Sequence, residues 1–374
     1  MKFSIVITVT KPEQSMLALE SALSQNYDDY EIIFSNNSGV DLRKNIKKIN
    51  SRKIKYFSTP KYLTIVEHWN FAFEKASGRW QLLLCDDDVL IFNKLKYLSD
   101  LIEKNKDPDL LMWDYGYYLE ENKRKVFSIP DRNFLKPFDI IYSKKILKDL
   151  YKSASLSGNV KQITPFLPRA VFSQKMIKKI KKVVGKLFIT PDPMTACAVS
   201  ALHSTKTVVK VNDFLTLINV TPKDNAVNHI KNPKTFKKMH YGVKIKYAPI
   251  KSMHNFPSTF LDTLLAIEEK FLKKPDFFVN YKNFFFFSYL QLLECDSNKI
   301  LQKKLAKQFK SDIKNQSYNV RFFLFLKIII YKLLKVKFLS FFKDKLRTNK
   351  YTMKILNFDE NSNINSYNNE FHRK

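Results

Sequence analysis

The stretch WQLLLCDDDVL, residues Trp80–Leu90, decides how the rest of the chain can be interpreted. It begins with a short apolar run that is typical of a buried strand, and the run stops at Asp86, Asp87 and Asp88. Three adjacent anions repel one another, and none is stable beside an apolar strand end without a counter-charge. A solvated acidic turn is the simpler alternative, and the triplet alone does not decide between that turn and a cation site.

A cation site at this position is chemically reasonable. Ligands of open α/β sheets bind beyond the carboxyl ends of the strands. Mg²⁺ typically takes one or two carboxylates, keeps some waters, and completes its shell with substrate phosphates. The stretch therefore predicts a site for a divalent cation and a diphosphate.

The segments around this stretch predict an α/β fold with a parallel sheet. Apolar, β-branched runs predict strands at residues 3–9, 31–34, 53–58, 80–85, 110–118, 207–211 and 214–220. Helical spacing of apolar residues predicts helices at 13–25, 65–76, 93–104, 171–182 and 194–202. Strand, helix and strand at this spacing form βαβ units. Residues 126–149 are basic, irregular and Pro-containing, and are predicted to be an insertion or a loop-and-helix excursion.

The composition sets limits on partners and compartment. The 374 residues include 65 Lys and Arg against 35 Asp and Glu, a net charge of +30, which predicts attraction to nucleic acid, acidic lipid or a phosphorylated substrate. Three widely spaced cysteines, Cys85, Cys197 and Cys295, give no disulfide framework, so a reducing, cytoplasmic compartment is expected. No uncharged apolar run of about 18 residues is present, so no membrane-spanning helix is expected.

The order of the motifs resembles family 2 inverting glycosyltransferases of the GT-A fold. FSIVIT opens the chain, LALESALSQNYDDYEIIFSNNS follows as helix and strand, and HWNFAFEKASGRWQLLLCDDD supplies a helix, a glycine and a DXD-type motif. The resemblance implies a Rossmann-like mixed sheet flanked by helices over residues 1–225. Two departures are Asn36, where the family usually has an aspartate, and a first loop without the common Pro-Thr-Tyr-type sequence.

The resemblance also implies roles for the residues at the strand ends. Asp88 would bind Mn²⁺ or Mg²⁺, Asp86 would face the ribose or the waters on the metal, and Asp87 could share either task. Thr8 and Thr10, in and after the first strand, would line the nucleotide. The donor implied is a nucleotide-diphosphate sugar.

Four further positions have a structural and a functional interpretation. Asn36 keeps a donor and an acceptor for the edge of a base. Trp69 either stacks near the nucleotide or packs in the core from a helix face. His229 is either a second metal-side ligand or an exposed loop histidine. Asp192, between two prolines, can cap the following helix and can also be the general base, because a capping position exposes the carboxylate.

The chemistry implied by the resemblance is a single displacement. Asp192 would take the proton from the acceptor hydroxyl as that oxygen attacks the anomeric carbon opposite the leaving diphosphate, which inverts the centre. The acceptor implied is a glycan or a polyprenyl-linked sugar, and the enzyme would be hexosyltransferase-like and serve surface polysaccharide biosynthesis.

The C-terminal third differs in character from the rest. Residues 226–350 predict a basic helical region, in which Arg321–Lys345, RFFLFLKIIIYKLLKVKFLSFFKDK, has the pattern of a basic amphipathic helix at a membrane surface. A packed helix with a solvated polar side is the alternative. Residues 351–374 are Asn-rich and predict a disordered tail. We therefore expect a peripheral protein on the cytoplasmic face of the inner membrane.

Two other functions were weighed against a transferase. A nucleotidyltransferase needs a loop after the first strand rich in glycine and basic residues, and TVTKPEQ does not supply one. A basic membrane- or nucleic-acid-binding protein on an inactive GT-A scaffold would explain the charge. It would not explain the acidic triplet, which repels phosphate without a metal. We therefore expect a glycosyltransferase without a nucleic-acid partner.

Overall fold

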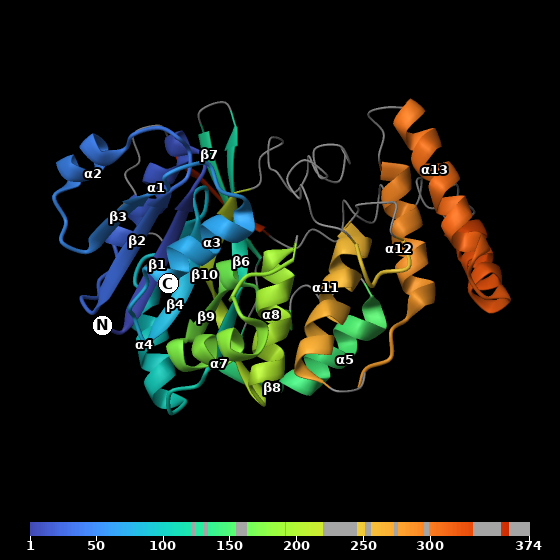
Figure 1. The fold of residues 1–374 in the computed structure, drawn as a ribbon. Helices are drawn as coiled ribbons and strands as arrows, with labels where there is room; N and C mark the ends of the chain where they lie inside the picture. Colours follow the sequence, from blue (N-terminus) through green and yellow to red (C-terminus); the bar gives the residue numbers. More distant parts are fainter. Residues whose placement is uncertain are drawn as a thin grey trace. The chain divides into compact units, whose positions relative to one another are not determined.

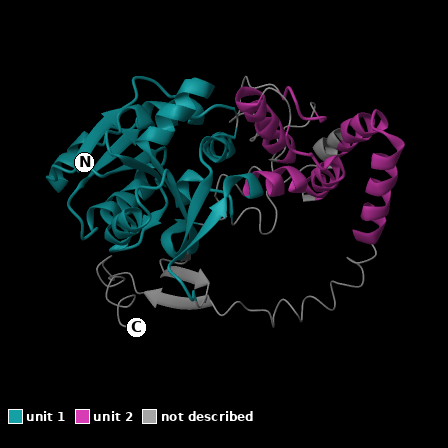
Figure 2. Cartoon of the chain, turned by 90° about the horizontal axis from the view of Figure 1, so that it is seen from below, with its two compact units in different colours: residues 1–145, 163–221, 354–374 teal, residues 146–162, 222–353 magenta. Residues whose placement is uncertain are grey.

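The computed structural model describes residues 1–121, 124–130, 134–154, 163–190, 192–219, 245–250, 256–272, 276–294, 299–331 and 353–358. The chain forms two compact units, coloured separately in Figure 2. Unit 1 comprises residues 1–145, 163–221 and 354–374, and unit 2 comprises residues 146–162 and 222–353. The predicted division after residue 225 differs from this arrangement because it left residues 146–162 in the first domain.

A single mixed sheet organises unit 1 (Figure 1). Its strands are β1 (Phe3–Val9), β2 (Tyr30–Asn36), β3 (Ile54–Ser58), β4 (Trp80–Cys85), β5 (Val89–Leu90), β6 (Leu110–Glu121), β7 (Arg124–Pro130), β8 (Phe138–Tyr142), β9 (Ala170–Ser173), β10 (Thr207–Asn219) and β11 (Met353–Phe358). The main path runs β11-β7-β6-β9-β4-β1-β2-β3, and β10 pairs with β5, β6 and β8. Strands β1 to β4 are parallel, whereas β9 runs antiparallel between β4 and β6.

Helices cover both faces of this sheet. Every residue of β1 is buried, as expected for a parallel strand covered on both sides. Ile5 and Ile7 share a core with α1 (Pro12–Leu23) and α4 (Lys94–Lys104). Alternate residues of a strand point to opposite faces, and α3 (Ile65–Glu74) contacts β1 and β2 outside that core. The predicted mixed sheet flanked by helices is confirmed.

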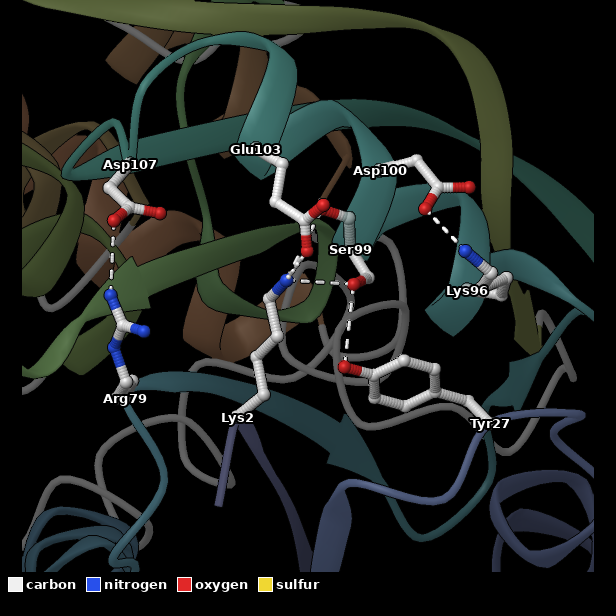
Figure 3. A network of polar contacts seen from close by, with 8 residues as sticks. All are labelled: Lys2, Tyr27, Arg79, Lys96, Ser99, Asp100, Glu103 and Asp107. Carbon is white, nitrogen blue, oxygen red and sulfur yellow. Dashed lines mark hydrogen bonds and ion pairs between the residues drawn. The ribbon is translucent and has the colours of Figure 1, made fainter.

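Polar contacts join α4 to Lys2, directly before β1 (Figure 3). The Lys2 ammonium group donates to Ser99 Oγ at 2.8 Å and pairs with Glu103 at 2.5 Å. Ser99 in turn donates to the Tyr27 hydroxyl at 3.3 Å. These contacts hold the start of the first strand against a helix that follows the triplet in sequence.

Some predicted elements differ from the structure. Residues 126–149, predicted to be an insertion or a loop-and-helix excursion, contain the start of helix α5 (Ser143–Ser153) but also most of β7 and all of β8, which were not predicted. The strands predicted at 207–211 and 214–220 are one strand, β10, whose pairing with β6 is irregular between Val211 and Phe214. Strand β8 pairs with β10, and that long-range pairing is not visible in its own short sequence.

Unit 2 is helical, which confirms the predicted C-terminal helical region. It contains most of α5, with α11 (Phe256–Phe271), α12 (Tyr281–Glu294), α13 (Lys299–Lys314) and a helix over residues 318–331. The Tyr151 hydroxyl of α5 donates to the Leu264 carbonyl at 3.0 Å, and its ring stacks on Phe277 at 5.0 Å between centroids. The remainder of the predicted surface helix, residues 332–345, lies outside the described residues.

The predicted disordered tail, residues 351–374, contains strand β11. In the strand order β11 lies next to β7. Its sequence, MKILNF, is an apolar run inside an otherwise Asn-rich segment, and strands form from such short runs when an edge is available. The rest of that segment lies outside the described residues.

Gly78, in the turn before β4, allows a close approach of two backbone segments. An alanine Cβ there would lie 2.5 Å from the Phe3 carbonyl carbon and 2.5 Å from the Ser4 nitrogen. Backbone atoms cannot yield as side chains do, so Gly78→Ala should lower the free energy of unfolding by about 3 kcal/mol in urea titration. The control is Gly185→Ala, with open space but φ of 92°, which should cost about 1 kcal/mol. Equal losses would contradict this explanation.

Candidate functional site

The acidic triplet lies at the edge where three parallel strands end. Thr8 of β1 pairs with Cys85 of β4 on one side and with Ser35 of β2 on the other. The next residue of β1, Val9, pairs with Asn36 at the end of β2. The loop after β1, the turn after β2 and the triplet after β4 are therefore neighbours at the carboxyl edge, where ligands of such sheets bind.

Asp86 joins the end of β4 to the loop after β1. Its Oδ2 accepts hydrogen bonds from Thr10 N at 2.6 Å, Lys11 N at 2.7 Å and Thr10 Oγ1 at 3.0 Å. Burial raises the pKa of Asp86; the backbone hydrogen bond from Thr10 lowers it, and the charge of Asp87 raises it. The predicted ribose-facing carboxylate thus also shapes the loop predicted to line the nucleotide.

Asp87 and Asp88 have different partners. Asp87 Oδ2 lies 3.2 Å from Lys11 Nζ, and one fifth of its side chain is exposed. Asp88 is only 3% exposed, and its Oδ1 accepts from Asn219 N at 3.3 Å. Burial, followed by the charge of Asp87, raises the pKa of Asp88 well above its usual value. The three carboxylates therefore do not share one counter-charge within the protein.

Asn219, the last residue of β10, completes the surroundings of Asp88. The Asn219 side chain is buried, and its Oδ1 has no hydrogen-bond partner within the part of the chain that the structure describes. Carboxylate and amide oxygens are ligands that Mg²⁺ and Mn²⁺ accept, so Asp88 with this unpaired oxygen fits a hard cation. Asn219 is not among the residues predicted from the sequence, because its place beside Asp88 depends on where β10 ends in the sheet.

No larger set of metal ligands accompanies this pair. Within the part of the chain that the structure describes, no three His, Cys, Asp or Glu side chains are placed to hold one ion. Two protein ligands are nevertheless usual for Mg²⁺, which takes its remaining ligands from water and substrate phosphates. The predicted metal ligand His229 lies outside the described residues.

Asn36 uses its side chain within the turn after β2. Its Nδ2 donates to the Val40 carbonyl at 2.6 Å and to the Tyr56 hydroxyl at 3.0 Å. Its Oδ1 accepts from Ser38 N at 3.0 Å and from Ser38 Oγ at 2.7 Å. Contact of the side chain with a base would require some of these bonds to break, so Asn36 shapes the turn, and its predicted contact with the base stays a prediction.

Trp69 is 6% exposed and packs inside unit 1. Its ring meets Phe188 edge to face, with centroids 5.3 Å apart, and Phe73 meets the same ring from α3. Asn70 Nδ2 donates to the Phe188 carbonyl at 2.8 Å, and Phe188 N donates to Asn70 Oδ1 at 3.2 Å. Trp69 thus has a core position, and its neighbours on α3 fasten the segment that leads to Asp192.

Asp192 caps the next helix, α8 (Pro193–Ser204). Its Oδ1 accepts from Thr195 N at 3.1 Å, and Pro193 occupies the first helical turn, as the capping interpretation predicted. Burial raises the pKa of Asp192, while its hydrogen bonds with Thr195 lower it. Among the contacts of the described residues, none joins Asp192 to the acidic triplet.

Comparisons with known proteins relate part of the chain to one enzyme family. Residues 4–161 match the family model for glycosyl transferase family 2. No curated protein matches the chain. The solved structure of S. aureus TarS 1–349 in complex with UDP-GlcNAc aligns at 13% identity over 85% of this chain and 74% of that one, with a TM-score of 0.45. The UDP complex of TarS 1–349 aligns at 15% identity over 85% and 93%, with a TM-score of 0.45.

The position of Trp69 predicts separate effects on stability and binding. Trp69→Ala should leave a cavity and lower the free energy of unfolding by about 4 kcal/mol. Trp69→Phe should cost less and should keep the full rise in melting midpoint that a nucleoside diphosphate with Mn²⁺ causes in the wild type. Thermal unfolding with and without ligand measures both. A Trp69→Phe protein of wild-type stability that loses the ligand-induced rise would show that the ring stacks on the nucleotide.

Proposed function

Because residues 4–161 belong to glycosyl transferase family 2, the chain is a glycosyltransferase, and we propose that it is an inverting, metal-dependent enzyme. It would move a sugar from a nucleotide-diphosphate donor to a hydroxyl group of a glycan or polyprenyl-linked acceptor in surface polysaccharide biosynthesis. The match confirms the predicted family and enzyme class. The observation that carries the proposal is the buried Asp88 carboxylate at the sheet edge, which accepts from the backbone N–H of Asn219, a residue whose own buried side-chain oxygen has no partner among the described residues.

Asp88 and Asn219 would hold the Mn²⁺ or Mg²⁺ ion. The metal would neutralise the charge that builds on the leaving diphosphate. A cation beside Asp88 would also relieve the cost of a buried carboxylate, which neither the Asn219 amide hydrogen nor the Cys85 thiol fully offsets.

The loop after β1 would bind the nucleotide of the donor. Asp86 holds the backbone of Thr10 and Lys11, so this loop is preorganised at the end of β1. Thr8 lies one step before it, paired with Cys85. The Lys11 ammonium group, now paired with Asp87, can exchange that carboxylate for a phosphate oxygen.

Asp192 would be the general base. A base works best when its pKa lies near the working pH, and burial moves the pKa of Asp192 upward from the usual value of an aspartate. The cap bond to Thr195 holds one carboxylate oxygen in place. The other oxygen can then receive the proton of the acceptor hydroxyl.

The helix over residues 318–331 favours attachment to an anionic membrane surface. Six large apolar side chains on it are exposed and follow helical spacing: Tyr318, Phe322, Phe325, Leu326, Ile329 and Ile330. We call this set the apolar stripe. The sequence continues with Lys332, Lys335 and Lys337, so apolar and cationic groups occur together, as in interfacial helices.

One lysine of this helix contacts α12. Lys327 Nζ donates to Asn283 Oδ1 of α12 at 2.8 Å and lies 5.0 Å from the Phe286 ring centroid. None of the described helices combines the length and hydropathy that crossing a membrane requires. We propose that the protein binds at the membrane surface, on the cytoplasmic face.

Asp88→Asn tests the proposed metal site. In thermal unfolding, nucleoside diphosphates or sugar nucleotides should raise the melting midpoint of the wild type only when Mn²⁺ is present. At a ligand concentration a hundredfold above Kd, the rise corresponds to about 2.7 kcal/mol of added stability. Asp88→Asn should lose that rise. Its midpoint without ligand should be equal or higher, because a neutral amide replaces a buried carboxylate.

The matched control is Asp100→Asn, which removes an exposed carboxylate paired with Lys96 and should keep the ligand-induced rise. If no nucleotide at millimolar concentration raises the melting midpoint of the wild type, the proposed activity is rejected. A rise that persists in Asp88→Asn would reject Asp88 as the ligand.

The membrane proposal predicts vesicle binding through the apolar stripe. The wild type should float with phosphatidylglycerol vesicles and not with phosphatidylcholine vesicles, and salt should weaken the binding. Replacing Phe322, Phe325 and Ile330 together by serine should reduce flotation at least about tenfold, because each buried apolar group contributes to insertion.

The control replaces two exposed apolar residues of unit 1, Tyr62 and Leu135, by serine, and should float as the wild type does. Unchanged flotation of the triple variant contradicts the proposal. A large fall in its melting midpoint also contradicts it, because that result would mean that the stripe is buried in the folded protein.

A further inference from the structure

Arg169 lies at the same sheet edge as the acidic triplet. It ends the short 3-10 helix η1 (Leu167–Arg169), directly before β9. Because β9 is antiparallel to β4, with Leu82 opposite Val171, the residue before β9 is level with the carboxyl end of β4, where the acidic triplet begins. The packing of η1 against β4, β6 and α8 agrees with this position.

The guanidinium group of Arg169 is enclosed by aromatic rings. It lies 5.2 Å from the ring centroid of Tyr115 and 5.2 Å from that of Phe166. One terminal nitrogen donates to the Thr164 carbonyl at 3.0 Å. Within the described ranges no carboxylate forms an ion pair with it, and nearby Asp114 pairs with Lys210 at 3.5 Å.

Folding alone does not account for a cation at this position. Arg169 is 2% exposed, and burial lowers its pKa to about 10, against the opposing effects of Tyr115, Asp114 and Tyr117. Removing a charge from water costs several kcal/mol, and a buried cation–π contact returns only about 2 kcal/mol. Five N–H donors point from the group, and one carbonyl satisfies one of them. An apolar side chain of similar length would suit the same space at less cost.

We propose that Arg169 binds an anionic oxygen of a substrate, a phosphate or a carboxylate, at the sheet edge of the transferase site. The planar guanidinium fork matches the two oxygens of such a group, and the aromatic rings exclude water and strengthen the contact. This assignment rests on the proposed function in one respect: the anion belongs either to the donor diphosphate or to a charged acceptor. The experiment below distinguishes those two sources.

The test uses the full chain and the variant Arg169→Met, which keeps the length of the side chain and removes its charge. Inorganic phosphate is titrated at constant ionic strength, and the thermal midpoint is measured. The wild-type midpoint should rise with phosphate, and this rise should be absent in Arg169→Met. Without phosphate, the midpoint of Arg169→Met should equal or exceed that of the wild type, because an uncompensated buried charge has been removed.

The matched control is Arg79→Met, which removes an exposed arginine that pairs with Asp107 and should keep the phosphate-induced rise. Arg169→Lys retains the charge without the fork and should keep part of the rise. A second titration uses a nucleoside diphosphate with Mn²⁺. If Arg169→Met loses that response as well, the anion is the donor diphosphate, and if it keeps that response, the anion belongs to the acceptor.

Three results would overturn the proposal. These are a wild-type midpoint that phosphate does not raise, a phosphate-induced rise that survives in Arg169→Met, and a failure of Arg169→Met to fold, which would make Arg169 a structural cation. Failure of the proposed transferase is a separate result, because it appears as a wild type that responds to phosphate and not to nucleotides with Mn²⁺.

Discussion

The hydrogen bonds between the Asp86 carboxylate and the loop after β1 are the constraint on which the site depends. One carboxylate oxygen accepts both backbone N–H groups of Thr10 and Lys11, so the ends of β1 and β4 are held at a fixed separation. A charged acceptor makes these bonds stronger than ordinary ones, and burial keeps water from competing for them. The loop can therefore remain ordered without the glycines that phosphate-binding loops usually contain.

The turn after β4 separates the three carboxylates and so reduces their repulsion. Asp86 turns toward β1, Asp87 toward Lys11, and Asp88 toward the end of β10. Asp86 and Asp88 are both deeply buried, but Asp86 accepts three hydrogen bonds from the loop after β1, whereas Asp88 accepts one backbone hydrogen bond, from Asn219. Among the described residues, Asp88 is thus the least compensated of the three carboxylates, and it is the one to which we assign the metal ion.

The sequence predicted the strands that are buried on both faces and missed those defined by their partners. Strand β1 and strand β4 are continuous apolar runs, so their own residues identify them. Strand β8 is short and no residue of it is fully buried, and its place in the sheet comes from its pairing with β10. The same dependence on distant pairing hid Asn219, since nothing local shows that β10 ends beside Asp88. The sequence left Trp69 with two interpretations, stacking on the nucleotide or packing in the core, because the spacing of apolar residues on a helix does not show which group the ring contacts.

Helix α3 contacts the strands of the nucleotide side and also holds Phe188 by two hydrogen bonds and two aromatic rings. The segment after Phe188 leads to Asp192. One helix therefore contacts the strands of the donor side and also fixes Phe188, the start of the short segment that leads to the proposed base. A substitution on the buried face of α3 would shift its contacts with the donor-side strands and with Phe188 together. We therefore expect this face of α3 to vary less in sequence than equally buried residues elsewhere in the protein.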